Sequence, residues 1–279
     1  MGVVGLGTMG AGIAQLFVQA GVETVGREVT EELGARARGR LDHYLGRGVE
    51  KGRLTAVEKE AALGRLTTTT DLGDLAECDF VIEAIVEDLD VKRRLFRELE
   101  AVVSAETVLA TNTSALSVTE VARATERPER VVGMHFFNPA PVLPLVEVVR
   151  TELSSEEAVE RAFALAERIG KAPIRCADTP GFVVNRILIP LLNDCVRVLD
   201  EADVTPDDLD KAMTRGVNWP IGPCALLDLI GLDVHVHASQ ALHEVLGEAR
   251  MAPPERLVRM REEGRLGRKS GQGFFRYEA

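Results

Sequence analysis

The chain has 279 residues, of which 46% are hydrophobic and 28% charged, so its composition is that of an ordinary globular protein long enough for two domains. Its formal net charge of -11 argues against nucleic acid as a partner, because phosphate backbones are bound by basic surfaces. No apolar run is long enough to span a bilayer and the N-terminus lacks the basic-then-apolar pattern of a secretory signal, so we expect a cytoplasmic protein with no membrane partner.

The first two thirds of the chain alternate short β-branched runs with helical stretches, a pattern typical of strand–helix units in a mostly parallel sheet. Between residues 30 and 64 we predict two polar helices, broken near "GRGVEKGRLT", that project as a helical hairpin. Ser154, followed by Glu157, predicts a capping box that opens a helix ending near Ile169. The predicted strands are residues 3–4, 23–25, 65–69, 79–85, 107–111, 130–136, 145–149 and 173–176.

The segment "VVGLGTMGAGIAQ" follows the first strand, opens a helix and sets Gly5, Gly7 and Gly10 in a G-x-G-x-x-G array. Such glycines allow a tight turn, close approach of the backbone to a pyrophosphate and close helix–strand packing. Glu28 ends the second strand, where a ribose-binding acid belongs, and it favours NAD over NADP although Arg27 is adjacent. The alternatives are a merely flexible turn and a solvated loop acid.

Ser114, in "TVLATNTSALSVTE", comes just after another predicted strand, at the edge where open α/β sheets bind ligands. It is either a helix N-cap or a hydroxyl available to a ligand. Ser117 and Glu120 already have the spacing of a capping box, which favours the second interpretation.

The segment "VVGMHFFNPAPVLPLVEVV" sets His135 and Glu147 into two apolar strands joined by a proline-rich loop. The prolines make this loop a turn-back, so we predict that the two strands lie side by side. The carboxylate can then bind one imidazole nitrogen and leave the other to exchange protons with a ligand. A buried pair that only satisfies its own hydrogen bonds is the alternative.

After "CADTPGF" the strand signals end, and helices are predicted near residues 183–201, 206–215, 224–247 and 254–263. We therefore expect an α/β fold in two domains. Residues 1–178 form a Rossmann-like, doubly wound dinucleotide-binding domain with the hairpin as an insertion, and residues 179–279 form an all-α domain. The four cysteines lack CxxC spacing and are expected to be reduced core thiols. His235 and His237 are expected to be surface or helix-face histidines rather than metal ligands.

Together with "VIEAIVEDLDVKRRLF", "DTPGFVVNRILIPLLND", "PIGPCALLDLIGLD" and "GRKSGQGFF", these segments resemble the L-3-hydroxyacyl-CoA dehydrogenase family, in order and over nearly the whole chain. The resemblance is greatest to the short, single-function bacterial members that act on 3-hydroxybutyryl-CoA. It implies an NAD-dependent enzyme of fatty acid metabolism that interconverts a (3S)-3-hydroxyacyl-CoA and a 3-oxoacyl-CoA. It also implies a homodimer formed through the helical domain.

The resemblance further implies the roles of individual residues. The histidine matching His135 takes the substrate hydroxyl proton during hydride transfer, and the acid matching Glu147 orients and supports it. The residues matching Ser114 and Asn185 hydrogen-bond the reacting oxygen or the thioester. The resemblance also implies Ser114 as a substrate contact. Lys51 and Arg53, as cations on the hairpin of an acidic protein, are candidates for binding the phosphates of CoA. The implied cofactor contacts are Gly5, Leu6, Gly7, Thr8, Met9, Gly10, Glu28, Glu87, Lys92, Asn138 and Lys269.

Two features depart from the family pattern. Glu28 stands where an Asp is more usual, and Gly26 with Arg27 interrupts a strand that is commonly apolar, which bears on cofactor affinity and on NAD/NADP preference. Two other functions remain open. A dehydrogenase of a free hydroxy or sugar acid, of the L-gulonate 3-dehydrogenase type, would keep the same site residues. A non-catalytic NAD-binding or structural protein would have no need of Ser114, His135, Glu147 and Asn185 together.

Overall fold

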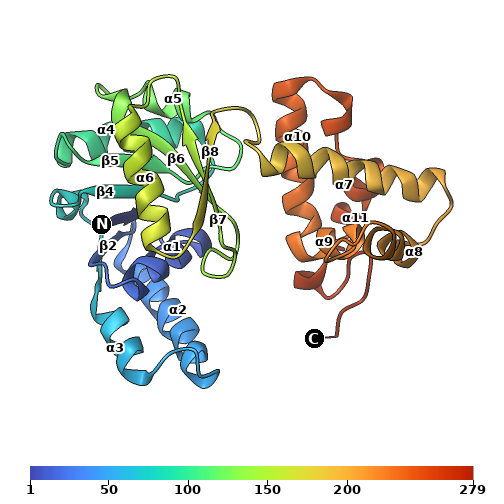
Figure 1. Cartoon of the computed structure of the whole chain (residues 1–279), viewed down its shortest axis with the longest axis horizontal. Helices are drawn as coiled ribbons and strands as arrows, with labels where there is room; N and C mark the ends of the chain where they lie inside the picture. The colour runs from blue at the N-terminus through green and yellow to red at the C-terminus, as the bar shows by residue number, and fades with distance from the viewer. Residues whose placement is uncertain (279) are drawn as a thin grey trace. The chain divides into compact units, whose positions relative to one another are not determined.

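The computed structural model describes residues 1–278, which divide into two compact units, one spanning Met1–Phe182 and one that begins at Val183. The first unit contains the β-sheet, and the second consists of helices and turns with isolated β-bridges (Figure 1). The boundary predicted from the sequence, after residue 178, lies just beyond the last strand and four residues before the boundary between the units.

The described residues of the first unit include one eight-stranded sheet with the order β3-β2-β1-β4-β5-β6-β7-β8. Every neighbouring pair is parallel except β6 and β7, which are antiparallel. The strand order reverses between β1 and β4, and such a switch point is where open α/β sheets bind nucleotides. The predicted doubly wound, mostly parallel sheet is confirmed. The strands are β1 Gly2–Val4, β2 Thr24–Arg27, β3 Leu66–Thr69, β4 Phe80–Glu83, β5 Val108–Thr111, β6 Val131–Phe136, β7 Leu145–Arg150 and β8 Ala172–Ala177.

Helices cover both faces of the sheet because each carries an apolar stripe. On one face, Phe17 of α1 and Val159 of α6 belong to one buried core cluster. On the other face, Phe96 of α4 and Val121 of α5 belong to a second buried cluster. The helices of this unit are α1 Thr8–Gln19, α2 Glu31–Glu50, α3 Ala56–Gly64, α4 Leu89–Val102, α5 Val118–Ala122 and α6 Glu156–Arg168.

The predicted hairpin between β2 and β3 is confirmed as α2 and α3 (Figure 1). Thr30 caps α2 by accepting a hydrogen bond from the Leu33 N–H. Thr55 and Glu58 form a full capping box at the start of α3. These caps satisfy backbone donors that a polar helix would otherwise leave to water, and so define where both helices begin.

Two predicted caps differ from the observed ones. Helix α6 is capped by Ser155, not by Ser154, because the Ser154 hydroxyl is buried and donates to the Val131 carbonyl at 2.6 Å. Ser117 does cap α5, but the reciprocal half of the predicted box is absent among the described contacts of Glu120. The Glu120 carboxylate instead pairs with Arg93 and Arg123.

The second unit packs five α-helices, counted over its described residues, around Leu192, Leu227 and Leu257. The helix predicted at 224–247 is two helices, because Gly231 adopts φ +98°, which breaks the helical path. The helix predicted at 206–215 ends at Lys211 and continues as a π-helical turn over Ala212–Gly216. The helices are α7 Val184–Glu201, α8 Pro206–Lys211, α9 Pro223–Ile230, α10 Leu232–Leu246 and α11 Glu255–Glu262.

The two histidines of α10 differ in their surroundings. His237 is exposed, as expected of a surface histidine. His235 lies on the buried face of α10, and its Nε2 lies 2.9 Å from Asn193 Oδ1, so of the two expected alternatives it is a helix-face histidine and not a surface one. No cluster of three or more potential metal ligands occurs within residues 1–278. The four cysteines of the described chain are free thiols. Three of them are buried, and Cys176 is partly buried. None of the described helices has the length and apolarity to span a membrane.

Candidate active site

The glycine-rich loop between β1 and α1 has the backbone geometry of a dinucleotide cradle. Gly5 has φ +84°, and a Cβ there would lie 2.8 Å from the Ala84 carbonyl oxygen. A Cβ on Gly10 would lie 1.7 Å from the Gly5 carbonyl oxygen, so no larger residue fits. By contrast, a Cβ on Gly7 would meet no described atom within 4 Å, which leaves open space in front of the start of α1. These are the three requirements of a pyrophosphate-binding turn.

Glu28 follows β2 and its carboxylate lies against this loop. It accepts hydrogen bonds from the Leu6 N–H at 2.6 Å and from the Val29 N–H at 3.1 Å. Arg40, on α2, donates to the Leu6 carbonyl at 2.6 Å, so the loop is held from both sides. Arg27 is turned toward β3, where its Nε donates to the Thr70 carbonyl at 3.3 Å.

The expected interruption at Gly26 does not break β2, which pairs with both neighbours through Arg27. A Cβ on Gly26 would lie 2.7 Å from Leu6 Cδ1, so the glycine makes room for the side chain of the loop. The departure from an apolar strand therefore has a packing reason.

His135 and Glu147 face one another across β6 and β7, in register, as the turn-back through the prolines predicted. His135 Nδ1 lies 2.6 Å from Glu147 Oε2, and the two side chains are 5% and 0% exposed. A carboxylate can only accept a hydrogen bond, so Nδ1 is the donor in this pair, and in the neutral tautomer of the ring the lone pair is on Nε2. The rings of Phe137 and Phe182 lie 4.5 Å and 5.6 Å from the imidazole, centroid to centroid.

Ser114 completes a row that runs from the interior to the surface. Its Oγ lies 3.1 Å from His135 Nε2, and Ser114 is exposed whereas His135 and Glu147 are buried. If His135 and Glu147 served only to satisfy their own hydrogen bonds, both imidazole nitrogens would be bonded to partners in the core. Here the outer nitrogen meets an exposed hydroxyl, so a proton can pass between the imidazole and a ligand at the surface.

A buried charge network supports the loop that carries Ser114. Lys92, fully buried, donates to Glu83 Oε1 at 2.5 Å and lies 3.4 Å from Glu87 Oε2. The other Glu87 oxygen accepts from the Ser114 N–H at 2.9 Å and from the Thr113 hydroxyl. Because a buried ammonium requires compensating carboxylates, Lys92 holds Glu87 against the backbone of Ser114.

These groups share one edge of the sheet. The glycine-rich loop, Glu28, Glu87 and Ser114 follow β1, β2, β4 and β5, and His135 lies near the end of β6. These five strands are parallel, so their carboxyl ends lie at the same edge. Asn138, also exposed, follows β6 at the cis peptide bond to Pro139.

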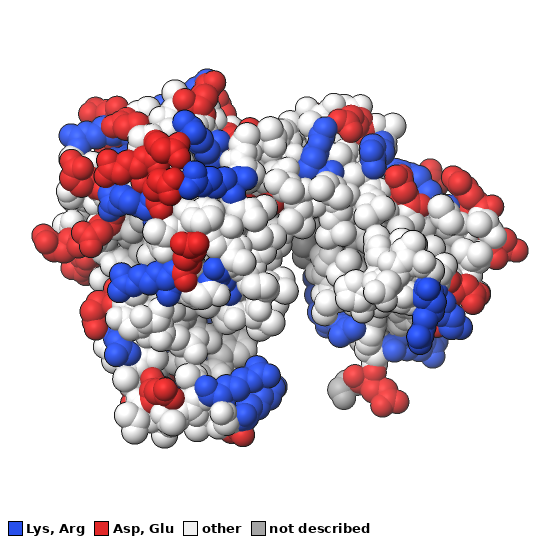
Figure 2. All heavy atoms as spheres, in the orientation of Figure 1, with Lys and Arg blue, Asp and Glu red and all other residues white. Residues whose placement is uncertain are grey.

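Other predicted site residues lie elsewhere in the chain. Lys51 and Arg53 are exposed at the tip of the α2–α3 hairpin, where Figure 2 shows basic side chains gathered. Asn185 lies in the first turn of α7 and Lys269, paired with Asp233, in the C-terminal segment of the second unit. Arg40, Glu83 and Asn112 also support the site but were not predicted from the sequence. The Asn112 Oδ1 accepts from the Phe136 N–H at 2.9 Å. Their roles arise from contacts across the fold, for which the sequence carries no local signal.

Comparison with known proteins identifies relatives of the whole chain. The family model described as "3-hydroxyacyl-CoA dehydrogenase, NAD binding domain" matches residues 1–179, and that described as "3-hydroxyacyl-CoA dehydrogenase, C-terminal domain" matches residues 181–277. The chain is 46% identical to a 3-hydroxybutyryl-CoA dehydrogenase of Mycobacterium tuberculosis, over 99% of this chain and 98% of the relative. It is 44% identical to a probable 3-hydroxybutyryl-CoA dehydrogenase of Deinococcus radiodurans, over 99% of both. The crystal structure of (S)-3-hydroxybutyryl-CoA dehydrogenase from Ralstonia eutropha superposes with a TM-score of 0.94 at 38% identity, over 100% of this chain and 98% of that one.

Proposed function

The chain belongs to the 3-hydroxyacyl-CoA dehydrogenase family, and we infer from this that it is an NAD-dependent oxidoreductase that interconverts 3-hydroxyacyl-CoA and 3-oxoacyl-CoA. We propose further that its substrate is (3S)-3-hydroxybutyryl-CoA. The observation that supports this chemistry best is the hydrogen-bonded row Glu147–His135–Ser114. Through this row a proton can pass between the buried imidazole and a ligand at the edge of the sheet where the glycine-rich loop also lies.

The residues at the switch point fit a dinucleotide. The space in front of Gly7 and the closely packed Gly5 and Gly10 form a cradle for the pyrophosphate at the start of α1. We propose that Glu28 exchanges its bond to the Leu6 N–H for the ribose hydroxyls, and that Glu87 and Asn138 lie along the nicotinamide half. Lys92 is fully buried, so its proposed role is to hold Glu87. When bound, NAD supplies the acceptor for the hydride that leaves C3 of the substrate.

The protein's own residues handle the proton of the substrate hydroxyl. His135 accepts it at Nε2 as the C3–O bond becomes a carbonyl, and the ring becomes an imidazolium. Glu147, hydrogen-bonded at Nδ1, fixes the tautomer and stabilises that positive charge. Ser114 donates a hydrogen bond to the reacting oxygen, and Asn185 is proposed to contact the oxygen or the thioester. In the reverse direction His135 returns the proton to the new alkoxide.

The cations Lys51 and Arg53 are proposed to bind the phosphates of CoA. Both are exposed at the tip of the hairpin, and neither side chain has a partner among the described contacts. An acidic chain needs such local cations to hold an anionic ligand.

The test is the loss of NADH absorbance near 340 nm with acetoacetyl-CoA, compared with acetoacetate and with NADPH as cofactor. Rapid turnover only with the CoA ester and NADH would support the proposal. If free hydroxy or sugar acids alone were turned over, measured as NADH formation in the reverse direction, the substrate class would be that of the gulonate-type dehydrogenases. Binding of NADH with no turnover on any of these substrates would favour the non-catalytic alternative.

We propose that the protein is a cytoplasmic homodimer assembled through its second unit. That unit exposes large apolar side chains, among them Ile187, Leu229 and Val245 at 61%, 53% and 65% exposure. Burial of such side chains in an isologous interface would remove them from water. Light scattering should report the mass of two chains, and a single-chain mass at micromolar concentration would exclude the dimer.

A further inference from the structure

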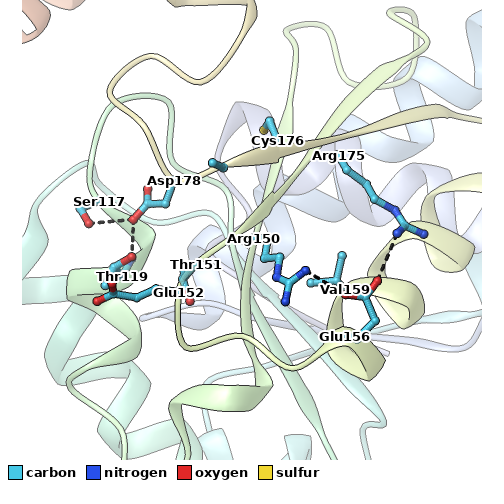
Figure 3. Close-up of a pocket in the computed structure, with 11 residues that line it drawn as sticks. Ser117, Thr119, Arg150, Thr151, Glu152, Glu156, Val159, Arg175, Cys176 and Asp178 are labelled. Carbon is cyan, nitrogen blue, oxygen red and sulfur yellow. Dashed lines mark hydrogen bonds and ion pairs between the residues drawn. The ribbon is translucent and has the colours of Figure 1, made fainter.

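Asp178, the first residue after β8, binds the start of helix α5 (Figure 3). Its Oδ2 accepts from the Ser117 hydroxyl at 2.9 Å and from the Thr119 N–H at 2.7 Å, and its Oδ1 accepts from the Val118 N–H at 3.1 Å. Its own N–H donates to the Arg150 carbonyl at 3.0 Å, which fixes its position beside β7. One carboxylate therefore satisfies three donors at the beginning of a short helix.

The loop bound by Asp178 is the loop that carries Ser114. It runs from the end of β5 to α5, and three carboxylate or carbonyl groups fix it. The Glu83 carbonyl accepts from the Asn112 N–H at 2.8 Å at its beginning, and Glu87 accepts from the Ser114 N–H in its middle. Asp178 holds its far end, three residues beyond Ser114.

Asp178 also begins the segment that leads to the second unit. This segment ends at Phe182, whose N–H donates to the Thr179 carbonyl at 2.8 Å and whose ring lies 5.6 Å from the His135 ring. Phe182 has φ +49°, an unusual conformation for a residue with a side chain. The segment thus contacts both partners of the 3.1 Å Ser114–His135 hydrogen bond: the loop of one and the ring of the other.

A hollow of about 710 Å³ lies beside Asp178. Ser117, Thr119, Arg150 and Cys176 line it, and neither Ser114 nor His135 does (Figure 3). Asp178 is therefore reached by water on one side, and its contacts with the Ser114 loop compete with hydration. A charged carboxylate holds the helix start against that competition better than a neutral amide of the same shape.

We propose that Asp178 is a positioning residue that keeps Ser114 within hydrogen-bond distance of His135 Nε2, and so ties the geometry of the row to the segment leading to the second unit. The proposal rests on the proposed function. The competing interpretation is that Asp178 is only a cap of α5 and contributes to stability alone.

A double-mutant cycle separates the two roles. Asp178→Asn keeps the size of the side chain but turns an amide N–H toward at least one of the three donors. We expect it to lower kcat with acetoacetyl-CoA about tenfold with little change in KM for NADH, and Ser114→Ala to lower kcat about a hundredfold. If Asp178 acts through Ser114, the double variant is no slower than Ser114→Ala within about twofold. Full multiplication of the two losses would overturn the proposal.

Ser155→Ala is the matched control, because it removes the N-cap of α6 in the same unit without touching the Ser114 loop. It should lower Tm as Asp178→Asn does but leave kcat unchanged. An equal loss of kcat in both variants would show general loosening and contradict a specific role. If Asp178→Asn fails to fold, as judged by circular dichroism, Asp178→Glu, which keeps the charge but moves it outward, replaces it in the same cycle.

Imidazole NMR provides a readout that does not depend on turnover. The chain has five histidines, and His135→Gln assigns the signal of His135. Ser114→Ala and Asp178→Asn should displace this signal in the same direction, with no further displacement in the double variant. An Asp178→Asn spectrum identical to that of the native protein would overturn the proposal even if acetoacetyl-CoA were not the substrate. If the native protein did not turn over acetoacetyl-CoA but the His135 signal were still displaced in Asp178→Asn, the result would count against the proposed function alone.

Discussion

His235 should make the stability of the second unit depend on pH. It is buried in α10, and its Nε2 donates to Asn193 Oδ1 at 2.9 Å. Asn193 is itself buried and donates to the Ser239 hydroxyl at 2.8 Å, so its carbonyl oxygen is the group that faces the imidazole. Burial, which disfavours the charged ring, lowers the pKa of His235 from 6.5 to about 4.

The magnitude follows from proton linkage. The folded-state pKa is lower than the unfolded one, so the unfolded chain binds more protons between these values and stability falls as pH falls. From pH 6.5 to about pH 5 the unfolded histidine becomes charged while the folded one stays largely neutral. With about 1.4 kcal/mol per pKa unit, this interval costs about 2 kcal/mol of unfolding free energy, and the loss levels off below the folded pKa.

The assay uses the single tryptophan, Trp219, which lies in the second unit. Urea titrations followed by its fluorescence, at about pH 7 and about pH 5, give the unfolding free energy of that unit. His235→Gln, which retains an amide donor for Asn193 but does not titrate, is the reference. We expect the native chain to lose about 2 kcal/mol more than the variant between the two pH values. A difference below about 0.5 kcal/mol would refute a neutral, buried His235.

Other changes test the cofactor site, the dyad and the hairpin. Gly7→Ala should leave Tm unchanged but weaken NADH binding about tenfold or more, because its methyl group would occupy the pyrophosphate space. Gly10→Ala should lower both Tm and the affinity for NADH. Equal Tm values for the two variants would contradict this prediction. Glu147→Gln should lower kcat about a hundredfold through loss of support for the imidazolium, measured by steady-state kinetics, and near-native turnover would remove Glu147 from the mechanism. Lys51→Ala with Arg53→Ala should raise KM for acetoacetyl-CoA about tenfold but not that for NADH; an unchanged KM would favour a free-acid substrate.

Local patterns predicted much of the fold because they follow directly from backbone chemistry. The glycine-rich turn and the alternation of strands with helices led to the doubly wound sheet. The prolines between His135 and Glu147 led to the antiparallel pair, in which the two residues are directly opposed. Such features depend on neighbouring residues alone, and the sequence displays them.

The sequence did not predict one break in a helix and several contacts between distant segments. The break at Gly231 was missed because a glycine within an apolar helical pattern is compatible with a continuous helix. The burial of His235 depends on Asn193, 42 positions earlier, and the cap on the Ser114 loop comes from Asp178, more than sixty positions later. No local spacing of residues predicts such pairs, because the residues come together only in the folded chain.

The measurement that tests the central claim most directly is the turnover of His135→Gln with acetoacetyl-CoA, together with its affinity for NADH. Glutamine cannot exchange a proton at the position of Nε2, but it leaves the glycine-rich loop and Glu28 untouched. We expect kcat to fall about a thousandfold with the Kd for NADH unchanged within about twofold. Near-native turnover in this variant would contradict the proposed role of His135 as the group that takes the substrate proton.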